Sequence, residues 1–304
     1  MYNDQEKEFI LSSLKGLLDL KLINENEYNK KIDQLNKIQN QEINLETKTN
    51  LEAEPIRNGE QGDVLIEVKN FSKKYERSAK AAVEDISFEI RKGQFHAFIG
   101  ANGAGKTTTM KALVGAYAKW DGEIKINGIS NQEAEAKAKI GYVPEQALFP
   151  KAFKTKEYLQ IMAELSGLSV EEAKNFAQSK LEEFNMQNLA NVSPQKFSSG
   201  QKKKILCAQA LCHDPEILIL DEPAANLDPI ARIELFDLLK KVQAQGKAIF
   251  ISSHILAEIG RYADYATILD GGKIVYSGPI NKNEDLEKLY NKYVIIGSVH
   301  TAKE

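Results

Sequence analysis

Short apolar runs recur between residues 64 and 269 and predict the strands of an α/β domain. In the first runs apolar and polar residues alternate, which is typical of strands with one buried face. In several later runs apolar residues follow one another, which indicates strands that are buried on both faces. The predicted strands are residues 64–68, 86–90, 95–99, 121–128, 140–143, 217–220, 248–251 and 266–269.

Residues 152–190 show a helical periodicity instead. Apolar residues that recur three or four positions apart share one face of a helix. We therefore expect a helical subdomain, at about residues 146–212, inserted in the α/β domain. Its two apolar faces consist of Tyr158, Ile161, Met162 and Leu165, followed by Ala173, Phe176, Ala177 and Leu181.

The first sixty residues have a pattern of their own. Apolar residues at helical spacing begin at Phe9, and Asn24 followed by Glu27 forms a capping box that predicts a second helix. We expect a helical hairpin over residues 1–39. Residues 40–62 contain few apolar residues and are expected to form a flexible linker. The globular domain would then cover residues 63–283, and residues 284–304 would form a C-terminal tail.

One loop carries the strongest chemical signal of the chain. Residues 100–108 read Gly-Ala-Asn-Gly-Ala-Gly-Lys-Thr-Thr and fit G-x-x-x-x-G-K-[ST] at every fixed position. A predicted strand precedes the loop, and residues 110–114 read as the start of a helix, so backbone N–H groups can face a phosphate. Lys106 would reach the β- and γ-phosphates of a nucleotide, and the Thr107 hydroxyl would hold Mg²⁺. Further nucleotide contacts are expected from Asn102, Gly103, Ala104, Gly105 and Thr108.

Two carboxylates follow the buried run of residues 217–220. A buried strand that ends in acids presents them at the phosphate site beside the glycine loop. Asp221 would reach Mg²⁺ through water, and Glu222 could polarise the attacking water. A strand followed by a solvated acidic turn is the alternative, but the phosphate loop upstream favours the catalytic interpretation.

Composition limits the other possibilities. The chain has 304 residues, of which 42% are hydrophobic and 27% charged, which is ordinary for a globular protein. A net charge of −3 argues against a nucleic-acid partner held by bulk charge. Cys207 and Cys212 lie in an apolar helical stretch and are expected to be core thiols. The sequence has no run of 18 apolar residues and starts with polar residues, so we expect neither a membrane span nor a signal peptide, and we expect a cytosolic address.

A second motif lies downstream of the helical insert. Residues 197–201 read Phe-Ser-Ser-Gly-Gln and precede a basic helix. This segment resembles the Leu-Ser-Gly-Gly-Gln signature of the ATP-binding cassette (ABC) ATPases. The order of the other motifs agrees with that family: an aromatic A-loop residue (Tyr75), the phosphate loop, a Q-loop after residue 143, the two acids, a D-loop at residues 226–228 and a switch histidine (His254).

The resemblance covers roughly residues 64–280 and implies a fold and a site. The fold is a P-loop NTPase cassette of the α/β class, with a mixed core sheet, an antiparallel β-subdomain and a helical subdomain. Tyr75 would stack on adenine, unless it is a plain surface tyrosine, and His254 would contact the γ-phosphate. The signature residues would bind the ATP held by a second cassette, so a complete site would need a dimer. These residues are Ser198, Ser199, Gly200 and Gln201.

The sequence departs from the family pattern at several positions. Phe197 replaces a leucine and should fill the same apolar slot, whereas Ser199 adds a side chain where backbone must approach phosphate. The Q-loop position falls on Glu145, with Gln146 beside it, and Glu145 could still approach Mg²⁺ as an oxygen donor. Gln209 stands where arginine is frequent, and nothing in the sequence explains that change.

The resemblance thus implies an ATP-hydrolysing subunit that is most like the drug- or lipid-export type. It would dimerise around Mg·ATP, bind a separate membrane permease at the inner face of the cell membrane, and touch the membrane only through it. Residues 148–153 would dock the permease, unless they pack within the domain. The N-terminal hairpin resembles the two-helix SHOCT module through its residues 22–28. The alternatives are a non-transport ABC ATPase of a soluble assembly and an ATP-gated interaction module.

Overall fold

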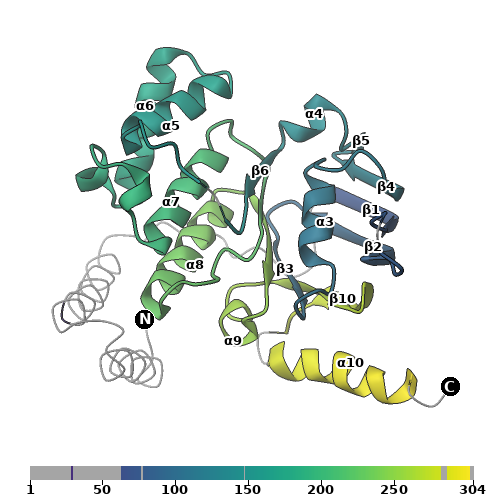
Figure 1. Cartoon of the computed structure of the whole chain (residues 1–304). Coiled ribbons are helices and arrows are strands. Elements are labelled where there is room, and N and C mark those ends of the chain that lie inside the picture. The colour runs from purple at the N-terminus through teal and green to yellow at the C-terminus, as the bar shows by residue number, and fades with distance from the viewer. Residues whose placement is uncertain (1–28, 30–62, 77, 147, 282–285, 302–304) are drawn as a thin grey trace. The chain divides into compact units, whose positions relative to one another are not determined.

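The computed structural model describes residues 29, 63–76, 78–146, 148–281 and 286–301. Its contacts divide the chain into two units: Met1–Glu60 with Leu227–Glu234, and Gln61–Asn226 with Leu235–Glu304. The predicted N-terminal hairpin and linker lie outside the described residues, apart from the helical Asn29. The larger unit holds two sheets with their helices (Figure 1).

The core of the larger unit is a six-stranded mixed sheet in the order β10-β9-β3-β8-β7-β6. Strands β6, β7, β8, β3 and β9 run parallel, and β10 pairs with β9 in the antiparallel direction. Every residue of β3, β7 and β8 is buried, which explains their uninterrupted apolar runs. The strands are β3 (Phe95–Gly100), β6 (Ile140–Val143), β7 (Ile217–Leu220), β8 (Ala248–Ser253), β9 (Tyr265–Asp270) and β10 (Lys273–Pro279).

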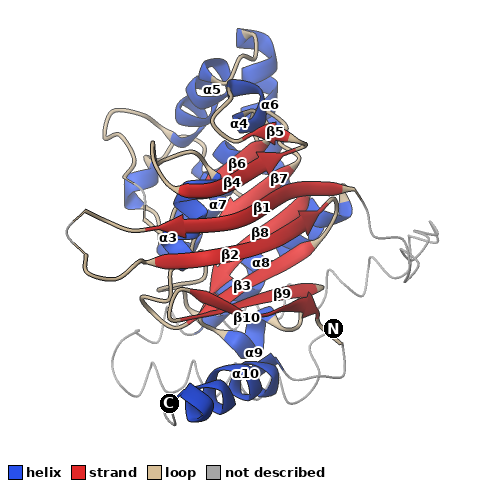
Figure 2. Ribbon diagram, turned by 90° about the vertical axis from the view of Figure 1, so that its right-hand side faces the viewer, coloured by secondary structure: helices blue, strands red, loops and turns tan. Residues whose placement is uncertain are grey.

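A second sheet is antiparallel and has the order β2-β1-β4-β5. Figure 2 shows both sheets in the same view, with α5 and α6 above them and α10 below them. Strand β2 alternates buried and exposed residues along most of its length, as a strand with one solvent face does. The strands are β1 (Val64–Lys73), β2 (Val83–Arg91), β4 (Asp121–Ile126) and β5 (Ile129–Ser130).

The two sheets share one apolar core. Phe88 of β2 stacks on Phe98 of β3 and on Phe250 of β8, with ring centroids 5.5 and 5.8 Å apart. Helix α3 (Lys106–Leu113) lies between the sheets in Figure 1 and buries Met110 and Leu113 in the same cluster. Aromatic burial of this kind is a dominant stabilising contribution, at about 150–250 Å² per ring. The helix at the phosphate loop is therefore anchored in the core that both sheets share.

The helical insert forms a separate lobe at the upper left of Figure 1. Ser169 caps α6 by accepting a hydrogen bond from the Glu172 N–H, while the Glu172 carboxylate accepts one from the Ser169 N–H. The insert contains α5 (Thr155–Leu165), α6 (Val170–Glu183), two 3₁₀ turns, η1 (Gln187–Leu189) and η2 (Pro194–Lys196), and α7 (Ser199–Ala210). These helices and turns lie between Thr155 and Ala210.

Several elements were not predicted from the sequence. Residues 286–301 form helix α10 (Leu286–Thr301), so most of the predicted C-terminal tail is helical. Its residues Leu286 and Leu289 are buried. The helix at the phosphate loop begins at Lys106, four residues before the predicted start. The other unpredicted elements are β5, β10, α4 (Ala134–Lys137), α8 (Pro229–Ala244) and α9 (Leu256–Ile259).

The described part of the smaller unit includes the stretch at which α8 begins. The Asp228 carboxylate accepts a hydrogen bond of 3.0 Å from the Ala231 N–H, and Pro229 occupies the first helical position. Acid caps and a proline at the first position are both favourable helix starts. No helix among the described residues has the length and apolar character needed to cross a membrane.

Candidate active site

The phosphate loop joins the end of β3 to the start of α3. Gly103 and Gly105 have φ angles of 83° and 109°, which side chains rarely adopt. A Cβ atom at Gly105 would also lie 2.7 Å from the Ala82 carbonyl oxygen. The sharp turn leaves backbone N–H groups of the first helical turn without helical partners, and these groups favour an anion. The loop therefore has the shape that its sequence predicts.

Lys106 is buried, with 5% of its surface exposed, and its amine lies within the loop. It donates to the carbonyl oxygens of Gly100 and Ala101 at 2.7 and 3.2 Å. The Glu222 carboxylate lies 3.2 Å from the same amine. A buried ammonium needs such partners because burial without them is very costly.

The two acids after β7 have separate surroundings. Asp221 is buried and accepts hydrogen bonds from the hydroxyls of Thr107, at 3.1 Å, and Ser252, at 2.9 Å. Glu222 adopts a positive φ of 43°, and its N–H donates to the Ser252 oxygen at 2.7 Å. Ser252 thus orients both acids. Sequence reasoning missed it, although it stands two positions before the predicted switch histidine.

His254 completes the cluster. Its Nδ1 lies 2.8 Å from one Glu222 carboxylate oxygen, while Lys106 faces the other oxygen. The three residues predicted as catalytic, Lys106, Glu222 and His254, are therefore connected through Glu222. A base that is held by a third group is the usual arrangement for activating a nucleophile.

A cavity of about 370 Å³ opens beside this cluster. It brings together the phosphate loop, Glu145 and the residues that follow β7 and β8, whereas Gln146 is not among its lining residues. The predicted Ala104 is buried and does not line it either. The lining consists of Ala82, Asn102, Gly103, Gly105, Lys106, Thr107, Thr108, Glu145, Glu222, Ala225, Asn226 and His254.

Tyr75 does not line this cavity but connects to it through the loop. Its hydroxyl is within hydrogen-bonding distance of Thr108 (3.1 Å) and of Tyr117 (2.7 Å). The Lys73 amine lies 4.9 Å from the Tyr117 ring centre. Burial, and then the hydrogen bond with Tyr75, raise the pKa of the Tyr117 hydroxyl well above its usual range. Tyr75 is 41% exposed, so its ring remains accessible to a planar ligand.

The signature residues do not line the cavity. Ser198 caps α7 and accepts from the Gln201 N–H, and the Gln201 side-chain oxygen accepts a hydrogen bond from the Ser198 N–H. Ser199 and Gly200 form the first turn of the helix. Phe197 is buried, so it fills an apolar slot as predicted.

Gln209, which the sequence left unexplained, now has a physical account. The Tyr158 hydroxyl donates to the Gln209 side-chain oxygen at 2.5 Å, and an arginine would offer no acceptor there. Phe149 is buried against the Tyr158 ring, with centroids 5.3 Å apart. Within the predicted docking segment, Phe149 therefore packs inside the domain, whereas Leu148 is 99% exposed.

The donor set suits Mg²⁺ and a nucleotide. Thr107 and Asp221 bring a hydroxyl and a carboxylate oxygen together, and hard oxygen ligands are what Mg²⁺ prefers. The glycine turn and Lys106 suit the phosphates. A parallel sheet with a phosphate loop after one strand and acids after another defines a P-loop nucleotide-binding protein.

Comparison with known proteins narrows this class. The model of the family described as ABC transporter matches residues 83–225. An ABC transporter ATP-binding protein of Mycoplasma pneumoniae is 46% identical over 216 residues, which cover 70% of this chain and 66% of the relative. The lantibiotic transport ATP-binding protein of Streptococcus pyogenes is 30% identical over 231 residues, which cover 76% of this chain and 98% of the relative. The chain belongs to the ABC transporter ATP-binding proteins.

Other matches agree with this assignment. A Nod factor export ATP-binding protein of Cupriavidus pinatubonensis is 32% identical over 70% of this chain, and the match again spans 66% of that relative, just under two thirds. Among solved structures, an ATP-binding subunit of an ABC transporter is 32% identical with a TM-score of 0.68, covering 75% of this chain and 99% of that one. The predicted ABC resemblance and fold class are confirmed.

Proposed function

We propose that the chain is the ATP-hydrolysing subunit of an ABC transporter. One observation carries the proposal: Lys106 and His254 both contact Glu222 at the cavity that Thr107 and Glu145 line. These residues supply phosphate binding, metal binding and a general base in one place. The whole-protein activity and partners are inferred, since the match spans 66% of the length of two of these relatives.

The phosphate loop, Asp221 and Glu145 bind Mg·ATP. Backbone N–H groups after Gly103 and the Lys106 amine bind the β- and γ-phosphates. Thr107 and Asp221 hold the metal, and Glu145 faces the same cavity as a further oxygen donor. Bound Mg²⁺ neutralises charge on the phosphate oxygens. Tyr75 presents its accessible ring to adenine, a contact that contributes about 1–3 kcal/mol in other base–aromatic stacks.

Hydrolysis falls to Glu222. Its carboxylate takes the proton of the water that attacks the γ-phosphate, a role that contributes about 10²–10⁴-fold. Ser252 fixes the backbone of Glu222, and His254 fixes one carboxylate oxygen. His254 is 48% exposed on its side chain, so it can also meet the γ-phosphate. Both functions of His254 favour hydrolysis over simple nucleotide binding.

The signature completes the site of a second chain. Ser198, Ser199, Gly200 and Gln201 lie at the start of the twelve-residue helix α7, where N–H groups and the helix dipole favour anions. They do not line the cavity of their own chain. A head-to-tail dimer brings them to the γ-phosphate on the partner, so that ATP closes the dimer and hydrolysis opens it.

The transport role is supported by the relatives. Their names describe export of Nod factors and transport of lantibiotics. We infer a membrane permease as the partner, a cytoplasmic site at the inner face of the membrane, and no nucleic-acid partner. Leu148 is an exposed apolar residue suited to docking. A soluble, non-transport assembly and an ATP-gated interaction module remain the competing functions, and neither draws support from these names.

Glu222→Gln tests the proposal. The amide keeps the shape of the side chain and lacks the base, so we expect ATP to bind, hydrolysis to fall by about 10²-fold or more, and closed dimers to accumulate. Gel filtration with Mg·ATP should show twice the monomer mass. Glu135→Gln is the matched control, since it changes an exposed carboxylate that does not line the cavity and should leave turnover unchanged. Persistence of the monomer at about tens of micromolar would contradict the homodimer.

A further inference from the structure

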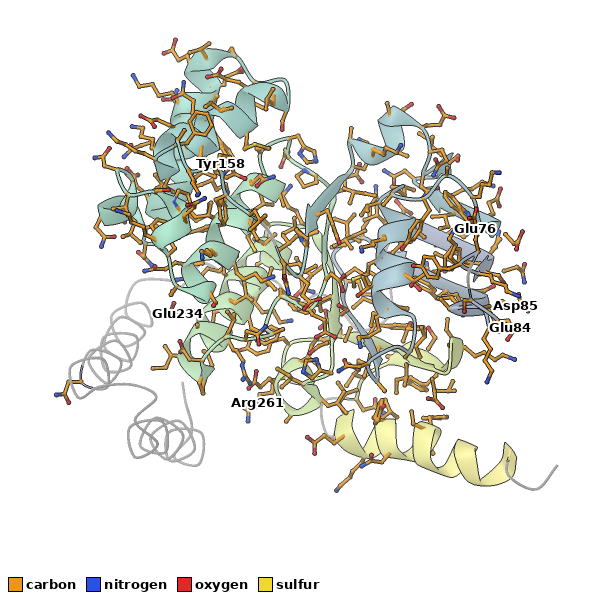
Figure 3. All side chains as sticks on the ribbon, viewed as in Figure 1. Glu76, Glu84, Asp85, Tyr158, Glu234 and Arg261 are labelled. Atoms are coloured by element: carbon orange, nitrogen blue, oxygen red, sulfur yellow. The ribbon has the colours of Figure 1, made fainter. Side chains whose placement is uncertain are left out.

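Two hydrogen-bonded ties join the Q-loop, residues 144–149, to the elements that carry the signature. The Lys203 amine of α7 donates to the carbonyl oxygens of Pro144 and Glu145 at 2.8 and 2.6 Å. The Gln195 side-chain amide, in η2, donates to the Phe149 carbonyl oxygen at 2.7 Å. The signature Ser198 lies between these two donors in the sequence. Tyr158, labelled in Figure 3, lies in the same lobe and packs on Phe149.

Lys203 is an unusual residue to find in this place. Only 6% of it is exposed, and burial lowers the pKa of its amine. Neither of these two hydrogen bonds ends on a carboxylate, because both acceptors are main-chain oxygens. Burying an amine costs free energy unless its N–H groups donate hydrogen bonds. The two carbonyl oxygens together therefore fix the position of the Lys203 amine. A lysine with three donors can bridge two successive carbonyls, which a shorter polar side chain cannot reach.

The start of the Q-loop is fixed to the core sheet instead. The Val143 carbonyl accepts a hydrogen bond of 2.9 Å from the Asp221 N–H, at the point where β6 and β7 end. Glu145 therefore lies two residues beyond the end of β6. Its carbonyl oxygen accepts one of the hydrogen bonds from Lys203 of α7. Glu145 also lines the candidate nucleotide cavity. The contact between Lys203 and Glu145 thus links the cavity to the signature helix.

We propose that Lys203 is a positioning residue that sets the place of Glu145 relative to Ser198. Lys203 does not line the cavity and acts through the main chain of Glu145. The hydrogen bonds of Lys203 keep the cavity of a chain at a fixed distance and orientation from the signature of the same chain, which binds the ATP of the partner chain. The inference rests on the proposed ATP-driven dimer. It predicts that loss of the tie impairs closure and turnover while leaving the phosphate loop able to bind nucleotide.

Three variants of the full chain test this role. Lys203→Met keeps the length and removes the donors, Lys203→Arg keeps donors, and Lys202→Met removes the neighbouring lysine of the same helix. For Lys203→Met we expect a Kd for Mg·ATP within about twofold of the unaltered chain and a kcat lowered about 10- to 100-fold, as misplacement of a catalytic group does. Lys203→Arg should recover most of kcat, and Lys202→Met should match the unaltered chain.

A purely structural role gives a different result. If Lys203→Met lowers kcat no more than Lys202→Met, or weakens nucleotide binding as much as kcat, the proposal is wrong. Should Lys203→Met fail to fold, Gln195→Ala removes the second tie from an exposed turn. It should lower kcat about threefold without changing Kd, and an unchanged kcat would count against the proposal.

Dimerisation separates this inference from the proposed function. With Glu222→Gln alone, absence of an Mg·ATP-dependent dimer would contradict the proposed function. With that dimer present, the double variant Glu222→Gln and Lys203→Met should need about tenfold more ATP to form it. Dimer formation at the same ATP concentration in both chains would contradict only the role of Lys203.

Discussion

At the scale of single residues, Lys106 decides whether the cavity binds nucleotide. It is buried in the phosphate loop, where its amine contacts the loop carbonyls and Glu222. The same amine is the cation expected to face the β- and γ-phosphates. We expect Lys106→Ala to weaken Mg·ATP binding by about 100-fold or more, since losing one member of the buried charge pair of lysine and phosphate costs about 2–5 kcal/mol. Lys111→Ala removes an exposed lysine from the same helix and should bind normally. Calorimetric titration measures both, and wild-type affinity of Lys106→Ala would refute the site.

His96 makes stability depend on pH. It is fully buried beside Phe88, Phe250 and Tyr265, and burial lowers its pKa from 6.5 to about 3. The unfolded chain takes up a proton near pH 6.5, whereas the folded chain stays neutral until about pH 3. Stability therefore falls as pH drops through this window, by about 2 kcal/mol between pH 7 and pH 5.

Urea unfolding at pH 7 and pH 5 measures this effect. His96→Phe removes the titrating ring, so its loss of stability between the two pH values should be smaller by about 2 kcal/mol. Comparing the two chains cancels the contributions of other titrating groups. An equal pH dependence would show that His96 is not the source.

Residue-level prediction from sequence is most specific where a motif fixes both residue type and local geometry. The phosphate loop, Glu222 and His254 all belong to such motifs, and the structure places them at one cavity. Ser252 and Lys203 were not predicted, because their hydrogen-bond partners lie far away in the sequence. Asp221 is 31 positions from Ser252, and Glu145 is 58 positions from Lys203. Contacts over such distances follow from strand pairing and helix packing, which no local pattern encodes.

At the scale of elements, two matched helix caps separate stability from function. Ser169 caps α6 and Ser198 caps α7, each with a reciprocal capping box. Replacing either serine by alanine should cost about 0.5–2 kcal/mol of stability. Only Ser198→Ala should also lower ATP turnover, because Ser198 belongs to the signature. Thermal melts and ATPase assays of both variants test this expectation. Equal activity after equal destabilisation would contradict the assignment of the signature.

Elements with a clear burial pattern were the ones that the sequence predicted well. Strands β6 and β7 occupy the predicted residues, since each is a short apolar run that a charged residue precedes and that a proline or an acid ends. Strand β10 was missed because only one of its residues is buried and its exposed and half-exposed residues do not alternate. Helix α8 carries start signals at Asp228 and Pro229 that local reading could have used. Helix α10 covers most of residues 284–304, which we expected to form a tail without testing their helical periodicity.

At the scale of the whole molecule, the cavity assembles from segments far apart in the sequence. The phosphate loop, the Q-loop, the acids and His254 follow β3, β6, β7 and β8, which run parallel. The carboxyl ends of parallel strands meet at one edge of a sheet, where open α/β folds bind ligands. Every described lining residue belongs to the larger unit, and none comes from the first sixty residues.

This division predicts what the N-terminal segment does. The sequence of residues 8–38 indicates an apolar face, and a hairpin below about 40 residues is too small to bury such a face by itself. A linker of some twenty residues gives it a reach of roughly 25 Å. We therefore expect this segment to bind a partner or another copy of itself and to take no part in ATP chemistry.

Deleting residues 1–60 tests that expectation. ATP hydrolysis by the shortened chain should stay within about twofold, because the larger unit supplies all the described lining residues of the cavity. Recovery of the chain with its membrane or oligomeric partner should fall.

Replacing residues 40–60 by a glycine–serine linker of equal length keeps the hairpin and should preserve recovery. Loss of ATPase activity in a shortened chain that circular dichroism shows to be folded would make the hairpin part of the catalytic unit. Unchanged partner recovery would instead make it a passive extension.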